Sequence, residues 1–374
     1  MSKTVKIAMI GTGDISGIYL KNITETFHEI ELTGVCDLVR EKAEAAAKKW
    51  NVPRIYKDMY EAFDDPEVDI ILNLTRPDEH YGVTKPALLA GKHVYSEKPL
   101  AATFELGQEL VQIAKEKGLF LGGAPDTFLG AGIQTCRKLI DDGFIGDPVG
   151  AAAFMICRGH EGWHPDPEFY YKRGGGPMLD MGPYYVTALV NLLGGVRSLM
   201  GRTKTTFPHR TITSAPKRGT DITVDVPTYV TGIMDFDCGA VGTIFTTFDV
   251  YNEGQARLEV YGTKGVSYAD LFRGNSALTY STDGYDYASE KAGSSQGWTF
   301  TIFEEAFNQG YPQELAHFIH CVRTGEKPLV TGEDGRAVLE IIYAAYASAK
   351  SGAKVNLPFE PKGLKYPIEL LLGE

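Results

Sequence analysis

Hydrophobic residues follow two different patterns along the chain. Up to about residue 123, short apolar runs alternate with longer amphipathic stretches, which is typical of buried parallel strands joined by helices. Between about residues 196 and 281, apolar positions recur at every second residue between turn signals, which predicts antiparallel strands. The sequence therefore predicts an α/β protein with a doubly wound parallel sheet over residues 1–124. An α/β domain with a large, mostly antiparallel open sheet follows over residues 125–374.

The individual elements follow from the same patterns. In the first domain, the predicted strands are 5–10, 31–36, 54–56, 68–74, 93–96 and 119–123. The predicted helices are 14–27, 41–50, one that Asp58 and Glu61 open as a capping box, 81–90 and 104–117. In the second domain, the predicted strands are 150–158, 228–236, 241–248, 256–261 and 266–269, and the predicted helices are 133–142, 178–193, 312–323 and 333–349. Residues 280–297 are rich in Ser, Gly, Tyr and Asp and are predicted to form a loop.

A glycine turn joins the first predicted strand to the first helix. Gly11 permits a tight turn, and Gly13 lets a pyrophosphate approach the backbone at the positive end of the helix. Asp37 ends the second strand, where a carboxylate can accept both hydroxyls of an adenosine ribose and would repel a 2′-phosphate. Alternatively, Asp37 caps the helix that begins near Val39, on which we expect Arg40 to face solvent. The ribose interpretation predicts NAD, rather than NADP, as the cofactor.

The predicted strand 93–96 ends in Glu97-Lys98-Pro99. Pro99 cannot donate to a sheet ladder, so Glu97 and Lys98 point off the carboxyl edge of the sheet, where ligands bind in open α/β folds. The alternative is an ordinary surface lysine at a turn. The candidate cofactor-binding residues at this edge are Gly11, Thr12, Gly13, Asp14, Ile15, Asp37, Thr75, Arg76, Pro77, His80, Glu97 and Lys98.

In the second domain, a loop dense in polar and aromatic side chains precedes three glycines and a helix. The glycines at 174–176 let backbone or ligand approach closely. Asp180 and Tyr184 are four residues apart on the helix, so we expect them to be neighbours on a polar stripe. An Asp that complements the helix dipole, beside a half-buried Tyr, is the plainer interpretation. The candidate substrate contacts, besides Lys98, Asp180 and Tyr184, are Asp126, Arg158, His160, Trp163, His164 and Lys172.

Composition and charge exclude several functional classes. The 374 residues are 43% hydrophobic and 23% charged, which is ordinary for a globular protein. The formal net charge of −11 argues against a nucleic-acid or anionic-membrane partner. No apolar run approaches the ~20 residues that span a bilayer, and we see no signal peptide. The five scattered cysteines predict reduced thiols and a cytoplasmic protein, and His160 and His164 lie in a Gly/Pro loop that does not predict a metal site.

Three motifs occur in a characteristic order that covers nearly the whole chain. They are Gly11-x-Gly13, Glu97-Lys98-Pro99, and Gly174-Gly175-Gly176 leading to Asp180-x-x-x-Tyr184. This set resembles the Gfo/Idh/MocA oxidoreductases, the family of glucose–fructose oxidoreductase and inositol 2-dehydrogenase.

The resemblance implies a Rossmann domain, a C-terminal domain with an open mixed sheet, and NAD(P)-dependent oxidation of sugar or polyol hydroxyls. It also implies that Lys98 lies near the nicotinamide, usually with a cis peptide before Pro99. Most members carry His where Tyr184 stands, and a minority similar to glucose–fructose oxidoreductase carries Tyr.

The chemistry of such an oxidation agrees with these residues. The nicotinamide takes a hydride from carbon, and the hydroxyl proton needs a base within hydrogen-bond reach. Tyr184 is the candidate base, since a cationic Lys98 nearby would favour its phenolate, and Asp180 could orient the hydroxyl or hold Lys98. Trp163 suits the apolar face of a sugar ring. We therefore predict an NAD-dependent dehydrogenase that acts on a secondary hydroxyl of a sugar, sugar derivative or polyol.

Two alternatives stay open, and one further expectation concerns assembly. An enzyme that retains its nicotinamide could oxidise its substrate transiently, with net glycoside cleavage or epimerisation. A non-catalytic NAD-binding regulator is the second alternative, although it would not need a proton-transfer set. Alternating aromatics at Tyr229, Phe236, Phe245 and Phe248 are expected to make one sheet face apolar. This predicts a homodimer or homotetramer formed through the C-terminal sheet.

Overall fold

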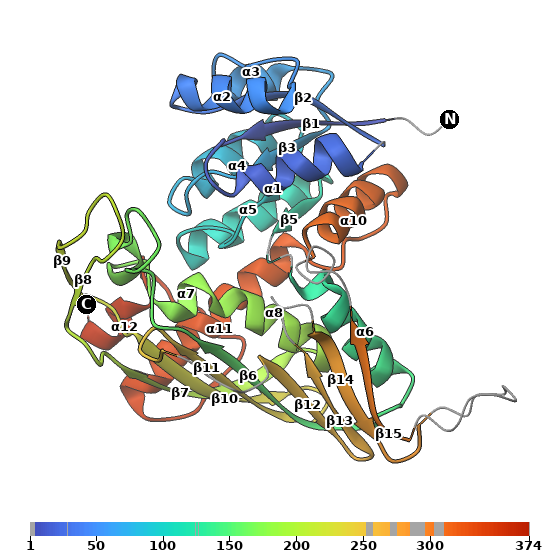
Figure 1. Ribbon diagram of the computed structural model, residues 1–374, viewed down its shortest axis with the longest axis vertical. Helices are drawn as coiled ribbons and strands as arrows, with labels where there is room; N and C mark the ends of the chain where they lie inside the picture. The colour runs from blue at the N-terminus through green and yellow to red at the C-terminus, as the bar shows by residue number, and fades with distance from the viewer. Residues whose placement is uncertain are drawn as a thin grey trace, which may run out of the picture. The chain divides into compact units, whose positions relative to one another are not determined.

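A computed structural model describes residues 4–27, 29–123, 125, 127–251, 257–269, 275–284, 296–302 and 310–373 (Figure 1). The chain forms two compact units: Met1–Asp126 with Tyr311–Ala337, and Thr127–Gly310 with Val338–Glu374. The sequence alone placed everything after residue 124 in one domain, whereas the segment 311–337 packs with the first unit.

The first unit is a Rossmann-type layer, as predicted. Its described residues form a five-stranded parallel sheet in the order β2-β1-β3-β4-β5. The strands are β1 (Val5–Ile10), β2 (Ile30–Cys36), β3 (Ile70–Asn73), β4 (His93–Ser96) and β5 (Leu121–Gly123). The helical segments are α1 (Ser16–Lys21), the π-helix η1 (Asn22–Thr26), α2 (Arg40–Trp50), α3 (Met59–Asp64), α4 (His80–Leu89), α5 (Phe104–Lys117) and α10 (Tyr311–Thr324), followed by the first residues of α11 (Gly332–Ser351).

Both faces of this sheet are buried. Ile7 and Met9 of β1 join an apolar cluster with residues of α1, α2 and α10, while Ala8 and Ile10 join a second cluster with residues of α3, α4 and α5. Side chains of a strand alternate between faces, so the two clusters mark the two sides of the sheet. The apolar stripe of α10 completes the first cluster, which explains why this late segment belongs to the first unit.

Two predictions for this unit are wrong in detail. The expected strand 54–56 forms only an isolated bridge between Ile55 and Val35, which is too short to add a strand to the sheet. The expected helix 14–27 is regular only over Ser16–Lys21 and then widens into η1. The Thr24 hydroxyl donates to the Leu20 carbonyl at 2.8 Å, a local bond that competes with regular helical pairing.

The second unit contains a large open sheet, which confirms the predicted fold class. Its described residues form nine strands in the order β15-β14-β13-β12-β6-β11-β10-β7-β16. All neighbours are antiparallel except β6 and β11. The strands are β6 (Pro148–Ile156), β7 (Val196–Lys204), β10 (Tyr229–Phe236), β11 (Val241–Thr247), β12 (Leu258–Gly262), β13 (Gly265–Ala269), β14 (Asn275–Ser281), β15 (Gly297–Ile302) and β16 (Val355–Asn356). A separate hairpin pairs β8 (His209–Thr211) with β9 (Asp221–Thr223).

Helices cover one face of the nine-stranded sheet (Figure 1). The helical segments of this unit are η2 (Thr127–Leu129), α6 (Ala131–Asp141), η3 (Glu168–Tyr171), α7 (Pro177–Asp180), α8 (Gly182–Leu193), the remainder of α11 and α12 (Ile368–Leu372). Among the described residues, no helix covers the opposite face (Figure 1).

The expectation that four aromatics share one face of the sheet is wrong. Phe236 and Phe248 are fully buried. Tyr229 and Phe245 are only partly buried, and their ring centroids lie 4.7 Å apart. Residues an odd number apart on a strand point to opposite faces, so Tyr229 and Phe236 cannot share one. Other residues make the uncovered face apolar, among them Met200 and Ile233, which are paired across β7 and β10.

Two further expectations for this unit need correction. The helix 178–193 is interrupted at Met181, so α7 ends at Asp180 and α8 starts at Gly182. Pro183 explains the interruption, because it has no N–H to donate to the Leu179 carbonyl and is tolerated only in the first turn of a helix, here that of α8. The expected loop 280–297 is shorter at both ends, since β14 runs to Ser281 and β15 starts at Gly297. Its residues 285–295 lie outside the described part of the chain.

Candidate functional site

The glycine turn of the first unit has the geometry that a bound pyrophosphate needs. Gly11 has φ +98°, and a Cβ there would lie 2.7 Å from the backbone of Leu74, so only glycine fits. A Cβ on Gly13 would meet nothing within 4 Å, which leaves the backbone open to a ligand. The Ser16 hydroxyl donates to the Gly13 carbonyl at 2.6 Å and fixes the turn at the start of α1.

Asp37 connects the end of β2 to this turn. Its Oδ2 accepts hydrogen bonds from the backbone N and the Oγ1 of Thr12, at 2.8 and 2.9 Å, and its Oδ1 accepts from Val39 N at 2.9 Å. Val39, rather than Asp37, occupies the N-cap position of α2. A carboxylate has about four acceptor positions, so Asp37 retains capacity for ribose hydroxyls. Arg40 lies on α2, exposed and paired with Glu44 at 3.0 Å, as expected.

The loop after β3 is held by buried side chains. Asn73 donates to the His80 carbonyl and to Thr84 Oγ1, both at 3.0 Å, and accepts from Thr75 Oγ1 at 2.6 Å. His80 places Nδ1 2.7 Å from the Pro99 carbonyl and Nε2 3.0 Å from the Thr75 carbonyl. Burial lowers the pKa of His80. His80 therefore ties the loop after β3 to the loop after β4, and its ring nitrogens are already engaged.

Glu97 and Lys98 follow β4, and Glu97 is buried. The Tyr19 hydroxyl donates to Glu97 Oε1 at 3.0 Å, and Lys98 N donates to Glu97 Oε2 at 3.1 Å. The Lys98–Pro99 peptide is cis, as the resemblance implied. Sequence reasoning missed Tyr19, because a tyrosine on the apolar side of α1 gives no sign that its hydroxyl reaches a carboxylate 78 residues away.

In the second unit, a buried histidine meets the predicted catalytic aspartate. His160 Nε2 lies 3.1 Å from Asp180 Oδ2, and the two side chains are 10% and 15% exposed. The rings of Tyr170 and Phe248 pack on the imidazole, with centroids 3.9 and 4.8 Å away. The Nδ1 atom of His160 is buried without a hydrogen-bond partner. Tyr184 is buried in the first turn of α8.

An ion network that the sequence did not reveal holds the loop of His160. Arg210, on the β8–β9 hairpin, donates to Glu161 Oε1 at 2.6 Å and to the Arg158 carbonyl at 2.9 Å, and also pairs with Asp249. The Tyr171 hydroxyl bonds to Glu161 and accepts from His160 N at 3.2 Å. Burial alone would raise the pKa of Glu161, but the hydrogen bonds from Tyr171 and Arg210 outweigh it and lower the pKa. Burial and the bond to Glu161 raise the pKa of Tyr171.

The other predicted substrate contacts differ in whether their side chains are already engaged by neighbouring residues. Lys172 donates to the Thr223 carbonyl at 2.9 Å and lies 3.2 Å from Asp225, so its charge is already paired. His164 accepts from Asp166 N at 3.0 Å, while Trp163 is 63% exposed. Asp126 lies outside the described residues.

Two negative findings concern the described part of the chain. No group of three or more His, Cys, Asp or Glu side chains there could hold a metal ion. No helix there is long and apolar enough to cross a membrane.

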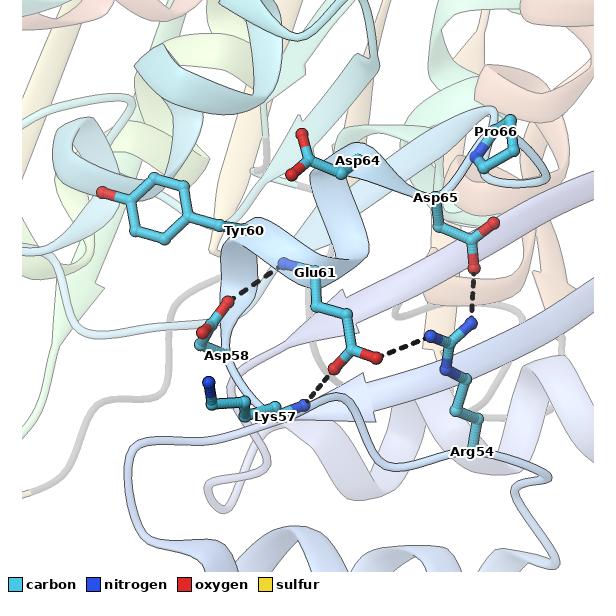
Figure 2. Close-up of a pocket in the computed structure, with 8 residues that line it drawn as sticks. All are labelled: Arg54, Lys57, Asp58, Tyr60, Glu61, Asp64, Asp65 and Pro66. Atoms are coloured by element: carbon cyan, nitrogen blue, oxygen red, sulfur yellow. Dashed lines mark hydrogen bonds and ion pairs between the residues drawn. The ribbon is translucent and has the colours of Figure 1, made fainter.

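A pocket of about 580 Å³ at the start of α3 lies apart from the predicted site residues (Figure 2). Arg54 donates to Glu61 at 2.7 Å and to Asp65 at 2.9 Å, and Asp58 accepts from Glu61 N at 3.0 Å as the cap of α3. Asp58 caps α3 as predicted, but the Glu61 side chain accepts from Lys57 N at 2.6 Å rather than from the Asp58 N–H that a capping box would use.

Sequence comparison relates both units to known proteins. A model described as "Oxidoreductase family, NAD-binding Rossmann fold" matches residues 5–123, and one described as "GFO/IDH/MocA C-terminal domain" matches residues 133–267. The scyllo-inositol 2-dehydrogenase (NAD(+)) of Bacillus subtilis is 26% identical over 96% of this chain and 97% of its own length. The myo-inositol 2-dehydrogenase of Thermotoga maritima is 25% identical over 94% of this chain and 98% of its own.

Solved structures share the fold over nearly the full length. An NAD-binding oxidoreductase from Klebsiella pneumoniae superposes with a TM-score of 0.81 at 22% identity, over 96% of this chain and 100% of the other. Levoglucosan dehydrogenase in complex with NADH and levoglucosan gives 0.80 at 21% identity, over 95% and 99%. Because the two family models together match most of the sequence, the chain belongs to the Gfo/Idh/MocA family of NAD-binding oxidoreductases.

Proposed function

We propose that this protein is an NAD-dependent dehydrogenase that oxidises a secondary hydroxyl of a sugar, sugar derivative or polyol to a ketone. The buried His160–Asp180 pair, with an unpartnered ring nitrogen, carries the proposal. A carboxylate that faces an imidazole is a proton-handling pair, which a non-catalytic regulator does not need. The inositol dehydrogenases that match nearly the whole chain support the substrate class.

The residues at the edge of the first sheet fit NAD. The open backbone at Gly13 would take the pyrophosphate, and Asp37 the ribose hydroxyls. Leu38, which sequence reasoning did not single out, is fully exposed beside Asp37 and offers an apolar surface to the adenine. When bound, the nicotinamide supplies the acceptor for the hydride. The remaining candidate cofactor contacts are Thr12, Asp14, Ile15, Thr75, Arg76 and Pro77, with Glu97 and His80 holding the loops that carry Lys98.

The protein's own residues then handle the proton. In the proposed reaction, the hydroxyl proton passes to Tyr184 as the carbon–oxygen double bond forms and the hydride leaves with its electron pair. Lys98 stabilises the charge on the phenolate oxygen. Asp180 orients the hydroxyl, and His160 fixes the orientation of the Asp180 carboxylate through the 3.1 Å contact.

A substitution series tests these roles. Tyr184→Phe removes one hydroxyl and should lower turnover about 10²–10⁴-fold, the usual cost of losing a general base, while NAD binding survives. Lys98→Ala should lower turnover as well, and Asp180→Asn should be intermediate. The Lys98/Tyr184 double variant should be little worse than the poorer single one, because residues that act as a unit are not additive.

The assay follows NADH absorbance with a panel of sugars and polyols, and folding is checked by circular dichroism. Near-normal turnover in folded Tyr184→Phe would remove Tyr184 from the mechanism and make His160 the leading base. Conversion of substrate without net NADH would identify an enzyme that retains its cofactor. Tight NAD binding with no conversion of any compound would favour the alternative of a non-catalytic NAD-binding regulator.

We also propose that the uncovered sheet face forms a homo-oligomer contact. Met200 and Ile233 are opposite each other on this face and about half exposed, and Trp298 and Val241 add apolar area. A monomer rarely leaves such a continuous apolar surface in water. A second copy presents the same face, so a two-fold dimer would bury both.

A further inference from the structure

Arg158 differs from the other cations around the His160–Asp180 pair. It lies in the loop after β6, two residues before His160. Its Nη1 is buried and has no hydrogen-bond partner, and within the described residues its guanidinium has no carboxylate in ion-pair contact. Three neighbouring cations, by contrast, are paired: Arg210 with Glu161 and Asp249, Lys172 with Asp225, and Lys217 with Asp166.

Two aromatic rings cover the Arg158 guanidinium. Its Cζ lies 4.6 Å from the ring centroid of Phe207 and 4.7 Å from that of Tyr251. Such contacts stabilise the cation, but they do not replace the acceptors that its five N–H donors have in water. The buried Nη1 of Arg158 therefore lacks an acceptor, and an oxygen of a ligand would supply one.

The backbone of Arg158 is held in place. Arg210 Nη1 donates to the Arg158 carbonyl at 2.9 Å and to Glu161 at 2.6 Å, so one guanidinium fixes both sides of His160. Arg210 faces two carboxylates, those of Glu161 and Asp249, which leaves one excess negative charge. Arg158, whose carbonyl accepts from Arg210, adds one positive charge to the same loop.

We propose that Arg158 binds an anionic group of the substrate, which makes the substrate an acidic sugar rather than a neutral polyol. A guanidinium presents paired N–H donors that match two oxygens of a carboxylate or a phosphate. A uronic acid and a sugar phosphate share this chemistry. The inference rests on the proposed oxidation of a sugar hydroxyl and adds the subsite that selects its substrate. The anionic group lies on a part of the substrate that does not react.

The test compares acidic and neutral forms of the same sugar. NADH formation is measured with D-glucose, D-glucuronate and D-glucose 6-phosphate, and with the corresponding galactose compounds. The wild type should prefer one acidic form, and Arg158→Gln should lower kcat/KM for that form about 10- to 100-fold, the usual effect of losing hydrogen bonds to a charged group. Activity on the neutral sugar should fall less than activity on the acidic form, so the ratio of the two kcat/KM values should decrease. Preference for the uronate or for the phosphate identifies the anion.

Two further variants distinguish recognition of the anion by the Arg158 guanidinium from a nonspecific effect of positive charge. Arg158→Lys keeps the charge but loses the fork of donors, so it should recover only part of the preference. Arg218→Gln removes the same charge from an exposed arginine beyond β8 and should leave the preference unchanged. A purely structural Arg158 would lower both activities together and leave their ratio intact.

Calorimetry with the NADH-loaded enzyme measures binding of the acidic sugar independently of its oxidation. If no sugar is oxidised, the proposed function fails, while binding of D-glucuronate or D-glucose 6-phosphate that Arg158→Gln abolishes would still support the anion subsite. Equal use of neutral and acidic sugars by the wild type would overturn the inference. So would a preference that survives in Arg158→Gln, or the absence of any binding by either acidic form.

Discussion

Arg210→Met is the perturbation with the largest expected effect on stability. The Arg210 side chain is 2% exposed, and its partners Glu161 and Asp249 are 13% and 6% exposed. Removing one partner from a buried ion pair leaves uncompensated charge in a poorly solvated site and costs about 3–5 kcal/mol. Here two carboxylates lose one guanidinium, so we expect a loss in that range at pH 8.0, together with lower turnover because the loop of His160 loosens.

The loss of stability in Arg210→Met should decrease as the pH falls. The folded-state pKa of Glu161 is lowered, so its contribution to stability is present above the unfolded pKa near 4.5 and is lost as the pH falls through the folded value. Without Arg210, the burial that raises the pKa of Glu161 is opposed by fewer hydrogen bonds, so Glu161 takes up a proton more readily as the pH falls. The difference between wild type and Arg210→Met should therefore be smaller at pH 6.0 than at pH 8.0.

The assay is urea unfolding of the full chain in a Trp50→Phe background. The remaining tryptophans, Trp163 and Trp298, both lie in the second unit, so their fluorescence follows the unit that contains Arg210. The control is the neutral set Glu161→Gln, Arg210→Met and Asp249→Asn, which should recover at least half of the loss because no charge stays buried.

Two outcomes would refute this reasoning. A loss below about 1 kcal/mol at pH 8.0 would mean that water reaches the network and screens it, as for surface pairs. A loss that is equal or larger at pH 6.0 would mean that packing of the Arg210 side chain, rather than the charge it neutralises, stabilises the loop.

The remaining predictions concern the cofactor and the assembly. Asp37→Ala should raise the dissociation constant of NAD about tenfold or more and reduce the difference between the dissociation constants of NAD and NADP, both measured by titrating intrinsic fluorescence. A lower dissociation constant for NADP than for NAD in the wild type would contradict the role of Asp37. Ile233→Asp places a charge on the uncovered sheet face and should dissociate the oligomer in sedimentation velocity, whereas the exposed control Arg218→Gln should not. A wild type that sediments only as a monomer at micromolar concentration would rule out this interface.

Local sequence was sufficient for most of the first unit. The bounds of β1 and β4 match the expected ranges, and Thr103 and Gly118 cap α5, because strand runs and caps depend on a few neighbouring residues. The edge that carries the glycine turn, Asp37 and Lys98 was equally predictable, since the carboxyl ends of parallel strands meet at one edge of the sheet.

Where the sequence failed, residues distant in the chain decided the outcome. The segment 311–337 packs with the first unit because α10 completes an apolar cluster there, and no local pattern shows which domain a late amphipathic helix covers. The opposite faces of Tyr229 and Phe236, by contrast, follow from local sequence alone, because the two residues are seven positions apart on β10.

The buried polar contacts of the candidate site were decided only by the tertiary structure. The Tyr19–Glu97, His160–Asp180 and Glu161–Arg210 contacts join residues 78, 20 and 49 positions apart. Sequence shows which side chains can donate or accept, and His160 and Asp180 were singled out on that ground. Which donor meets which acceptor depends on how sheet, hairpin and loop pack, because burial requires polar groups to find partners wherever the fold places them. That Nη1 of Arg158 is buried without a partner could likewise be seen only in the folded structure.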